Sequence, residues 1–418
     1  MPDYHGGDVE EMEDEYDMNE PVDDMEEEEE EEEDEYQEPA VRDSDVEEEE
    51  DEDQSHKVHD TSAADVRNGR DIQGIPWEKM AITRETYRQA RLEQYKNYEN
   101  IPNSGEAAMK QACKSTEKGG TYYEFRRNTR SVKSTISHFQ LRNLVWATSK
   151  HDVYLLLDYS VLHWSALSGG DTEIMDVDGH VAPSEKHPGS LLEGFFHTQI
   201  STMAVKDNLL VAGGFQGELI CKHLDREGIS FCCRTTFDDN AITNALEIFN
   251  TSSGALHFIA SNNDCGVREY DMERYQQYKH FRFDWPVNHT SLSPDGKLVV
   301  IVGDDTDALL IDANSGKTIH SMKGHLDYSF ASAWSPDGLT FATDGQFLSM
   351  AEAVDFVHIF DIKSDYNKRQ ELDFFGDVSG MSFSPDTDAL YVGVSDRTYG
   401  SLLQFGRRYN YSYLDSLL

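Results

Sequence analysis

The chain has 418 residues and a formal net charge of −44, but that charge is concentrated at one end. Residues 1–53 carry 31 acidic side chains and one basic side chain, whereas the rest of the chain carries 49 acidic and 35 basic. No run of about 18 apolar residues occurs, which argues against a membrane-spanning helix. The five cysteines are odd in number and include no CxxC pair, so we expect reduced thiols and not a disulfide framework. The first residues lack the pattern of a secretory signal, which favours the cytoplasm or the nucleus.

Residues 1–74 are expected to form a disordered acidic tail, because dense like charges repel and little of the segment is apolar. Three roles are open for it: a solubilising tail, a binding segment for basic proteins such as histones or ribosomal proteins, or an acidic activation segment. Direct binding of nucleic acid is not expected, since the tail would repel phosphate. Ser44, within DSDVEE, is a candidate phosphorylation site.

Residues 75–118 are expected to form a helical or linker arm. Thr83 can cap a helix, and Tyr87, Arg91, Tyr95 and Tyr98 then recur at helical spacing. This face could pack on the body of the protein or bind a partner.

From about residue 119 the chain changes to short apolar segments separated by turns. Ser293-Pro294-Asp295-Gly296 recurs 42 residues later at Ser335–Gly338, and Ser384-Pro385-Asp386 follows 49 residues after that. Ser, Pro, Asp and Gly in this order suit a type I turn. Residues 199–236 and 242–283 each contain four short strand-like segments, and a four-stranded unit of about this length is typical of a β-propeller blade.

These features resemble the WD40 family, over about 300 residues. The matching positions are the strand-ending aspartates Asp271, Asp312 and Asp361, the turn aspartates Asp264 and Asp305, and the Gly-His pair Gly324 and His325. The segments QGIPWEKMAITRETYRQARLEQYKNYEN, VAGGFQGELICKHL and DRTYGSLLQFGRRYNYSYLDSLL are similar to a group of plant and fungal WD-repeat proteins with an acidic N-terminus. The resemblance implies an all-β propeller over residues 119–418 that acts as an interaction scaffold.

One blade start is duplicated. Asp295 precedes the strand-ending Asp312 by 17 positions, and Asp344 precedes Asp361 by the same distance, but Asp337 precedes Asp361 by 24. The strand after Asp344 should therefore pair with the strand ending at Asp361. This spacing predicts two blades joined near residues 343–344, with about one repeat missing after Thr343 through a splice variant or a gene-model fault, or else a hairpin insertion in one blade. We expect about six blades here and seven in the proteins that the chain resembles.

Three further segments have predicted roles. Tyr122–Asn128 should complete the last blade beside LLQFGRR and so join the two ends of the propeller. The longest insertion, Gly169–Gly194, is either a partner site or an unstructured surface loop. The terminal stretch Arg407–Leu418 either docks on the propeller or is recognised by a partner.

No enzyme motif occurs, and no pair of the sixteen histidines has a ligand spacing supported by acids or cysteines. We therefore expect no catalytic residues, no cofactor and no metal. Cys232 and Cys233 should point to opposite faces of one strand and be unreactive. The favoured function is a non-catalytic scaffold for proteins, as a monomer or within a complex. The alternatives are an acidic-tail adaptor, chaperone or chromatin-associated regulator for basic proteins and, less favoured, a hydrolase-like propeller enzyme.

Overall fold

A computed structural model of the chain describes residues 59–94, 116–138, 143–323, 328–334, 347–351, 355–364 and 366–409. All of them belong to one compact unit, Lys57–Leu418. The predicted acidic tail with Ser44, the pair Gly324-His325, the turns at Asp337 and Asp344, and the last nine residues lie outside the described residues.

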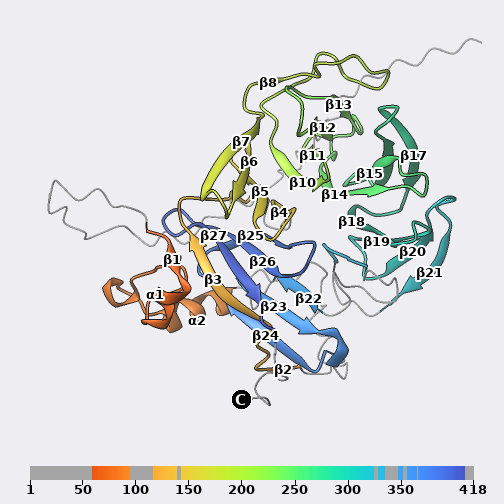
Figure 1. Cartoon of the computed structure of the whole chain (residues 1–418). Coiled ribbons are helices and arrows are strands. Elements are labelled where there is room, and N and C mark those ends of the chain that lie inside the picture. Colours follow the sequence, from red (N-terminus) through yellow and green to blue (C-terminus); the bar gives the residue numbers. More distant parts are fainter. Residues whose placement is uncertain are drawn as a thin grey trace, which may run out of the picture. The chain divides into compact units, whose positions relative to one another are not determined.

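Six sheets are arranged around a common centre (Figure 1). In blades A to D, four antiparallel strands follow one another in chain order, the first lying innermost. Blade A contains β4 (Val145–Ala147), β5 (Asp152–Leu157), β6 (Ser160–Ser165) and β7 (Gly170–Asp176). Blade B contains β10 (Ile200–Lys206), β11 (Leu209–Gly214), β12 (Glu218–His223) and β13 (Phe231–Arg234). Blade C contains β14 (Thr243–Asn250), β15 (Leu256–Asn262), β16 (Gly266–Asp271) and β17 (Gln276–Arg282). Blade D contains β18 (Val287–Leu292), β19 (Leu298–Gly303), β20 (Ala308–Asp312) and β21 (Thr318–Met322).

Blades E and F take strands from both ends of the described chain. Blade E contains β22 (Phe347–Ala351), β23 (Phe356–Asp361) and β24 (Lys368–Asp373), with the two-residue β2 (Glu117–Lys118) added in parallel. Blade F contains β25 (Asp377–Phe383), β26 (Ala389–Ser395) and β27 (Ser401–Arg407), followed by β3 (Tyr123–Thr129) and β1 (Thr61–Ser62). The expected number of about six blades and the two four-stranded units read from the sequence are confirmed.

The turns form as their sequences predict. In the turn after β18, the backbone N–H of Gly296 donates to Ser293 O (2.8 Å), which closes a four-residue turn. The Ser293 hydroxyl donates to Asp295 (2.8 Å) and accepts from the N–H of Leu298 (2.9 Å). The side chains of such a turn satisfy its backbone, so β19 begins at a defined residue.

Apolar side chains from both faces of the sheets fill the junctions between blades. Clusters of buried residues join F to A, A to B, B to C, C to D and E to F. At the F–A junction, for example, Trp164 meets Tyr391 edge-on with ring centroids 6.2 Å apart. This burial is the main stabilising term of a propeller.

The D–E junction differs from the other five. Among the described residues, the cluster on the other face of blade D consists of Val300, Val302 and Ala308, and Trp334 packs against it from outside the blade. Trp334 belongs to the segment Tyr328–Trp334. Like β18, this segment is followed in the sequence by Ser-Pro-Asp-Gly, but unlike β18 it does not form a strand. Its indole N–H donates to Ser291 O of β18 (2.8 Å), so the segment lies along blade D.

The pairing in blade E agrees with the interpretation of the duplicated start. β22 begins three residues after Asp344 in the sequence and pairs antiparallel with β23, with Phe347 opposite Asp361. The strand that the spacing predicted to pair with the strand ending at Asp361 is therefore β22, and the pairing is as predicted. Among the described residues, the strand pattern of blade E corresponds to β19, β20 and β21 of blade D, without a counterpart of β18.

We predict that the backbone amides of β22 exchange with solvent at least about tenfold faster than those of β19. In β19, Val299 and Ile301 enter one core cluster while Val300 enters another. In β22, Phe347 enters a cluster, whereas Met350 is 44% exposed. Hydrogen exchange read by mass spectrometry checks this difference, and equal protection of the two strands would contradict it.

The N-terminal part joins the last blade, as predicted for Tyr122–Asn128. β3 pairs antiparallel with β27 over six residue pairs, from Leu402↔Thr129 to Arg407↔Tyr123. β1 continues this sheet by pairing with β3. β1 and the helix that follows it, at residues 61–67, lie within residues 1–74, which the sequence predicts to be a disordered tail. Sequence inspection missed the capping box of Ser62 and Asp65, which opens α1 (Ala63–Arg67) immediately after β1.

The remaining helices are short. The arm contains η1 (Trp77–Lys79) and α2 (Arg84–Gln94), and η3 (Ile362–Ser364) follows β23. Among the described residues, no helix is long and apolar enough to span a membrane.

Candidate functional site

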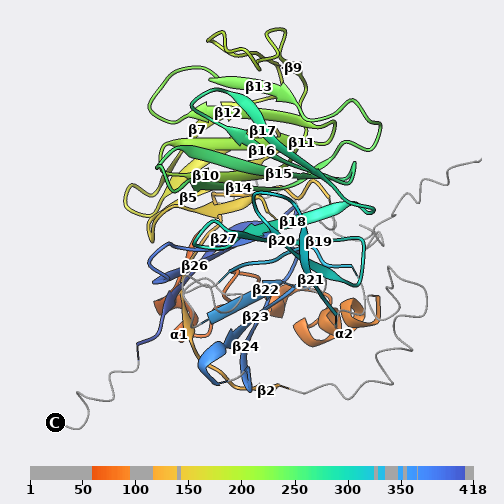
Figure 2. The same ribbon diagram turned by 90° about the vertical axis from the view of Figure 1, so that its right-hand side faces the viewer.

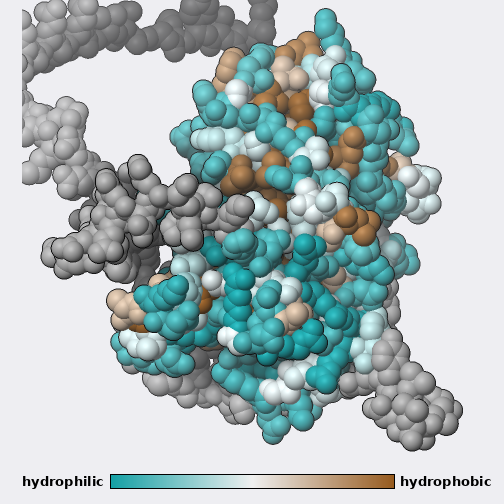
Figure 3. Space-filling view, turned by 60° about the vertical axis from the view of Figure 1, so that its left-hand side comes forward, coloured by the Kyte–Doolittle hydropathy of each residue, from teal (hydrophilic) through white to brown (hydrophobic). Residues whose placement is uncertain are grey.

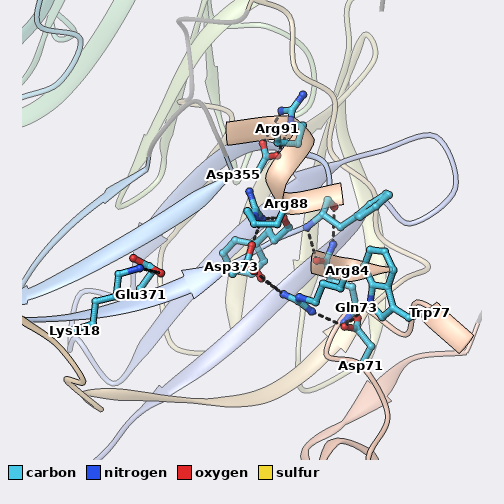
Figure 4. Close-up of polar contacts among 12 residues, drawn as sticks. Asp71, Gln73, Trp77, Arg84, Arg88, Arg91, Lys118, Asp355, Glu371 and Asp373 are labelled. Atoms are coloured by element: carbon cyan, nitrogen blue, oxygen red, sulfur yellow. Dashed lines mark hydrogen bonds and ion pairs between the residues drawn. The ribbon is translucent and has the colours of Figure 1, made fainter. Parts of the chain in front are cut away.

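The arm docks on blades E and F through a row of arginines (Figure 4). Arg84 donates to Asp373 O (2.7 Å), Arg88 donates to the Asp373 carboxylate, and Arg91 donates to Asp355 through Nε (3.0 Å) and Nη2 (3.1 Å). These arginines stand at helical positions i, i+4 and i+7, so one face of α2 presents them together.

Aromatic and amide contacts complete the dock. Tyr87 stacks on Phe375 with ring centroids 4.1 Å apart, and Trp77 meets the same ring edge-on at 5.1 Å. The Gln73 side chain donates to Phe375 O (2.8 Å) and accepts from Phe375 N–H (2.7 Å), and so replaces a backbone pairing. The N–H of Thr86 donates to the Thr83 hydroxyl (3.1 Å), which confirms the predicted cap.

The face of α2 that carries Tyr87 and Arg91 is therefore used within the chain. Of the two interpretations open from the sequence, packing on the body is confirmed for this part of the arm. Tyr95 and Tyr98 lie outside the described residues.

The Gly169–Gly194 insertion is not an unstructured loop. Its first residues form β7, the outer strand of blade A. The rest lies along the outer strand of blade B, where the N–H groups of Ser184 and Leu191 donate to Ile229 O (2.8 Å) and Cys232 O (2.7 Å). The insertion thus covers the edge of a sheet that would otherwise be open to pairing.

Where the insertion returns to blade B, aromatic side chains face solvent. β8 (His180–Val181) pairs with β9 (Phe195–Phe196), so Phe195 is buried while Phe196 is 68% exposed. His180 stacks on Phe196 with centroids 4.3 Å apart. Figure 2 shows β9 beside β13, and the apolar patch at the upper end of Figure 3 lies at the height of β8 and β13 in Figure 1.

An arginine continues this surface toward the next loop. The Arg234 guanidinium lies over the rings of Phe195 (5.6 Å) and Phe237 (5.9 Å), and Phe237 is 85% exposed. We call His180, Phe196, Arg234 and Phe237 the aromatic surface. Exposed aromatic rings and arginine are the residue types that dominate protein interfaces.

The aspartates singled out in the sequence lie in turns and at strand ends. Asp264 accepts from Gly266 N–H (3.0 Å) and is paired with Arg268, and Asp305 accepts from Asp307 N–H (2.7 Å). Asp271 and Asp312 each accept two N–H groups of the turn that follows them. Asp361 ends β23. The structure does not bring these five into one cluster.

The predicted placement of Cys232 and Cys233 on opposite faces of one strand is confirmed. Cys232 packs in the A–B core and Cys233 in the B–C core, as opposite faces of one strand require. Burial raises the pKa of each thiol to about 12, so both remain protonated at neutral pH. Among the described residues, no group of three or more His, Cys, Asp or Glu is placed to hold a metal ion.

A groove of about 930 Å³ opens between blades C and D. Its polar wall includes Glu269, which accepts from His257 Nδ1 (2.6 Å) and Lys279 Nζ (2.9 Å), and Asp271, which binds Arg274 (2.8 Å). Sequence inspection missed this network because its members are cross-strand neighbours, such as His257 opposite Asp271, and their proximity depends on register.

Glu247 in the same groove has an unusual environment. Its Oε2 accepts from the N–H of Leu292 (2.8 Å). Burial raises the pKa of its carboxyl to about 7, against the smaller opposing effects of that hydrogen bond and of Lys206. Because the folded pKa exceeds the unfolded value, the folded state retains the proton to higher pH, and stability is lost as pH rises from about 4.5 to 7.

We expect Glu247→Gln to leave stability unchanged near pH 4 and to raise the free energy of unfolding by about 1–3 kcal/mol at pH 8. The amide keeps an acceptor for Leu292 but cannot ionise. Denaturant titrations at several pH values measure the difference between variant and parent. Asp295→Asn is the opposite control: hydrogen bonds from Ser293 and Lys297 lower that pKa to about 2, so this variant should lose stability above pH 4. If Glu247→Gln changed the free energy of unfolding by the same amount at every pH, the ionisation of Glu247 would not be the cause.

Comparison with known proteins supports the architecture. No protein-family model and no curated protein sequence matches the chain. Among solved structures, a chain in the "Crystal Structure of Mitotic Checkpoint Complex" is 14% identical, with a TM-score of 0.50 over 72% of this chain and 97% of that one. The fold is a β-propeller of six blades. The WD40 β-propeller domain of Doa1 is also similar, at 14% identity and a TM-score of 0.43 over 70% of this chain and 99% of that one.

The propeller topology assigns the two surfaces to different faces. In each WD40 blade the turns after the first and third strands lie on one face, and the turn after the second strand and the link to the next blade lie on the other. Phe196 and Phe237 stand in links between blades. The groove is bordered by turns of the first kind, at residues 250–255, 271–274 and 293–297.

Proposed function

We propose that the protein is a non-catalytic scaffold that binds other proteins through the aromatic surface. The observation that carries this proposal is the exposure of Phe196 and Phe237 on links held between packed blades, with the Arg234 guanidinium lying over Phe237 and over Phe195, the neighbour of Phe196. Leaving two phenylalanine rings in water has a free-energy cost of about 1.5–3 kcal/mol each, which a partner that covers them would recover. Rigid presentation also limits the entropy lost on binding.

Affinity purification tests the proposal. The double variant Phe196→Ser, Phe237→Ser should lose a defined set of co-purifying proteins that the parent chain retains. The matched control is Ile319→Ser, because Ile319 is 56% exposed but lies on β21, away from the aromatic surface. If the double variant and the control retain the same proteins as the parent, the aromatic surface is not the binding site.

The charge of residues 1–53 supports a second candidate, an acidic-tail adaptor or chaperone for basic proteins such as histones. A chain that lacks residues 1–58 keeps every described element and separates the two ideas. If the truncated chain no longer binds basic proteins, the acidic tail is their binding segment. Unchanged partners would reject it.

A further inference from the structure

The groove between blades C and D contains one carboxylate that the fold leaves without a cationic partner. Among the described residues, no Lys, Arg or His nitrogen lies within 4 Å of Glu247, although Lys206 lies near enough to favour its ionised form. Its one hydrogen bond, from Leu292 N–H, occupies a single oxygen. A carboxylate can accept several hydrogen bonds, so Glu247 has capacity left.

Three of the other four acidic side chains of the groove are already paired. Glu269 binds Lys279, Asp271 binds Arg274, and Asp295 binds Lys297 (3.0 Å). Glu273 is exposed at the rim. Outside these pairs, the charged side chains of the groove are Glu247, Glu273 and Lys206. When Glu247 is ionised, the groove therefore has an excess of one negative charge. The groove is therefore complementary to one added cation.

The floor of the groove is apolar. Ile259, Val299 and Ile311 line it and belong to the C–D core. A volume of about 930 Å³ is more than enough for one long side chain. Apolar floor beside an incompletely paired carboxylate suits a side chain that combines a hydrocarbon stem with a charged end.

We propose that this groove binds an arginine side chain of a protein partner, with Glu247 as its anionic contact and the apolar floor against its stem. The planar guanidinium offers paired donors to a carboxylate, which a lysine ammonium does not. The proposal rests on the proposed function in so far as the ligand belongs to a protein. Because the groove and the aromatic surface lie on opposite faces, two partners could be held at once.

A peptide array tests the ligand chemistry directly. The probes are blocked heptapeptides with leucine and glycine flanks and each of the twenty amino acids in turn at the centre. The full-length chain should bind the arginine-centred peptide best, and Glu247→Gln should weaken that binding at least tenfold. Glu247→Lys should abolish it, since it places a like charge at the site. Asp171→Asn is the control and should leave binding unchanged, because Asp171 is exposed on β7 of blade A and does not line the groove.

Equal binding by the parent chain and Glu247→Gln would overturn the proposal, as would a preference for an acidic or purely apolar central residue. Thermal unfolding of each variant shows that it is folded before binding is compared. The double variant Phe196→Ser, Phe237→Ser should keep the arginine preference. Failure of the groove is thereby distinguished from failure of the aromatic surface.

Discussion

Replacing Arg91 by alanine is expected to lower the free energy of unfolding by about 3–5 kcal/mol at pH 8. Asp355 is 1% exposed and has a left-handed backbone (φ 67°). Arg91 gives it two hydrogen bonds from the arm. Without Arg91 the carboxylate stays buried and ionised with much less compensation, because its side chain cannot turn to solvent without moving the strand.

The same variant should show a pH dependence of definite sign. Burial outweighs Arg91 and raises the pKa of Asp355 to about 6. Since this value lies above the unfolded one, ionising Asp355 lowers stability as pH rises from about 4 to 6, and removing Arg91 makes that loss larger and extends it to higher pH. The difference in free energy of unfolding between Arg91→Ala and the parent chain should therefore be smaller at pH 5 than at pH 8.

Urea titrations at pH 5 and pH 8 measure both effects. Lys297→Ala is the control, because its pair with Asp295 is mostly exposed and should contribute little to stability. A loss below 1 kcal/mol for Arg91→Ala would show that the arm does not anchor blade E.

Removing β3 is expected to prevent cooperative folding. Tyr123 is buried in the E–F core, and its hydroxyl donates to Thr387 O (2.7 Å). Loss of a buried aromatic ring alone costs about 3–5 kcal/mol, and the ladder between β3 and β27 is lost as well. Together these approach the whole stability of a typical domain, about 5–15 kcal/mol.

Three chains make this comparison. The chain from residue 59 keeps every described element, the chain from residue 116 lacks the arm but keeps β3, and the chain from residue 136 lacks both. We expect sharp thermal unfolding of the first, a lower midpoint for the second, and no cooperative transition for the third. Equal midpoints for the chains from residues 116 and 136 would contradict the role assigned to β3.

The fold could be predicted from the sequence to the extent that its signals are local. Ser-Pro-Asp-Gly turns, strands ended by aspartate and a fixed repeat length identify blades without knowledge of what they contact. The β3–β27 pairing was also predictable, because a propeller lacking one outer strand needs an apolar strand from the other end of the chain. β22 and its pairing with β23 followed from the equal spacing of Asp344–Asp361 and Asp295–Asp312.

The candidate sites depend on contacts between distant residues, and local patterns do not show these. Arg91 was visible at helical spacing, but its partner Asp355 lies 264 positions away. Phe196 and Phe237 come from separate links, and Arg234 connects these links because its guanidinium lies over both Phe195 and Phe237. In the sequence, Glu247 is one polar residue in a strand of alternating polar and apolar residues. Whether its carboxylate has a cationic partner depends on which side chains blades B and D place near it, and the sequence does not show this.

The most direct test of the scaffold account is a photo-crosslinking residue placed at position 237 of the full-length chain in cells. Benzoylphenylalanine at this site is close in shape to phenylalanine and reacts with whatever covers the aromatic surface. We predict discrete heavier adducts for position 237 and not for the same residue at position 319. The absence of adducts at 237, or an identical pattern at both positions, would show that the aromatic surface does not bind a protein.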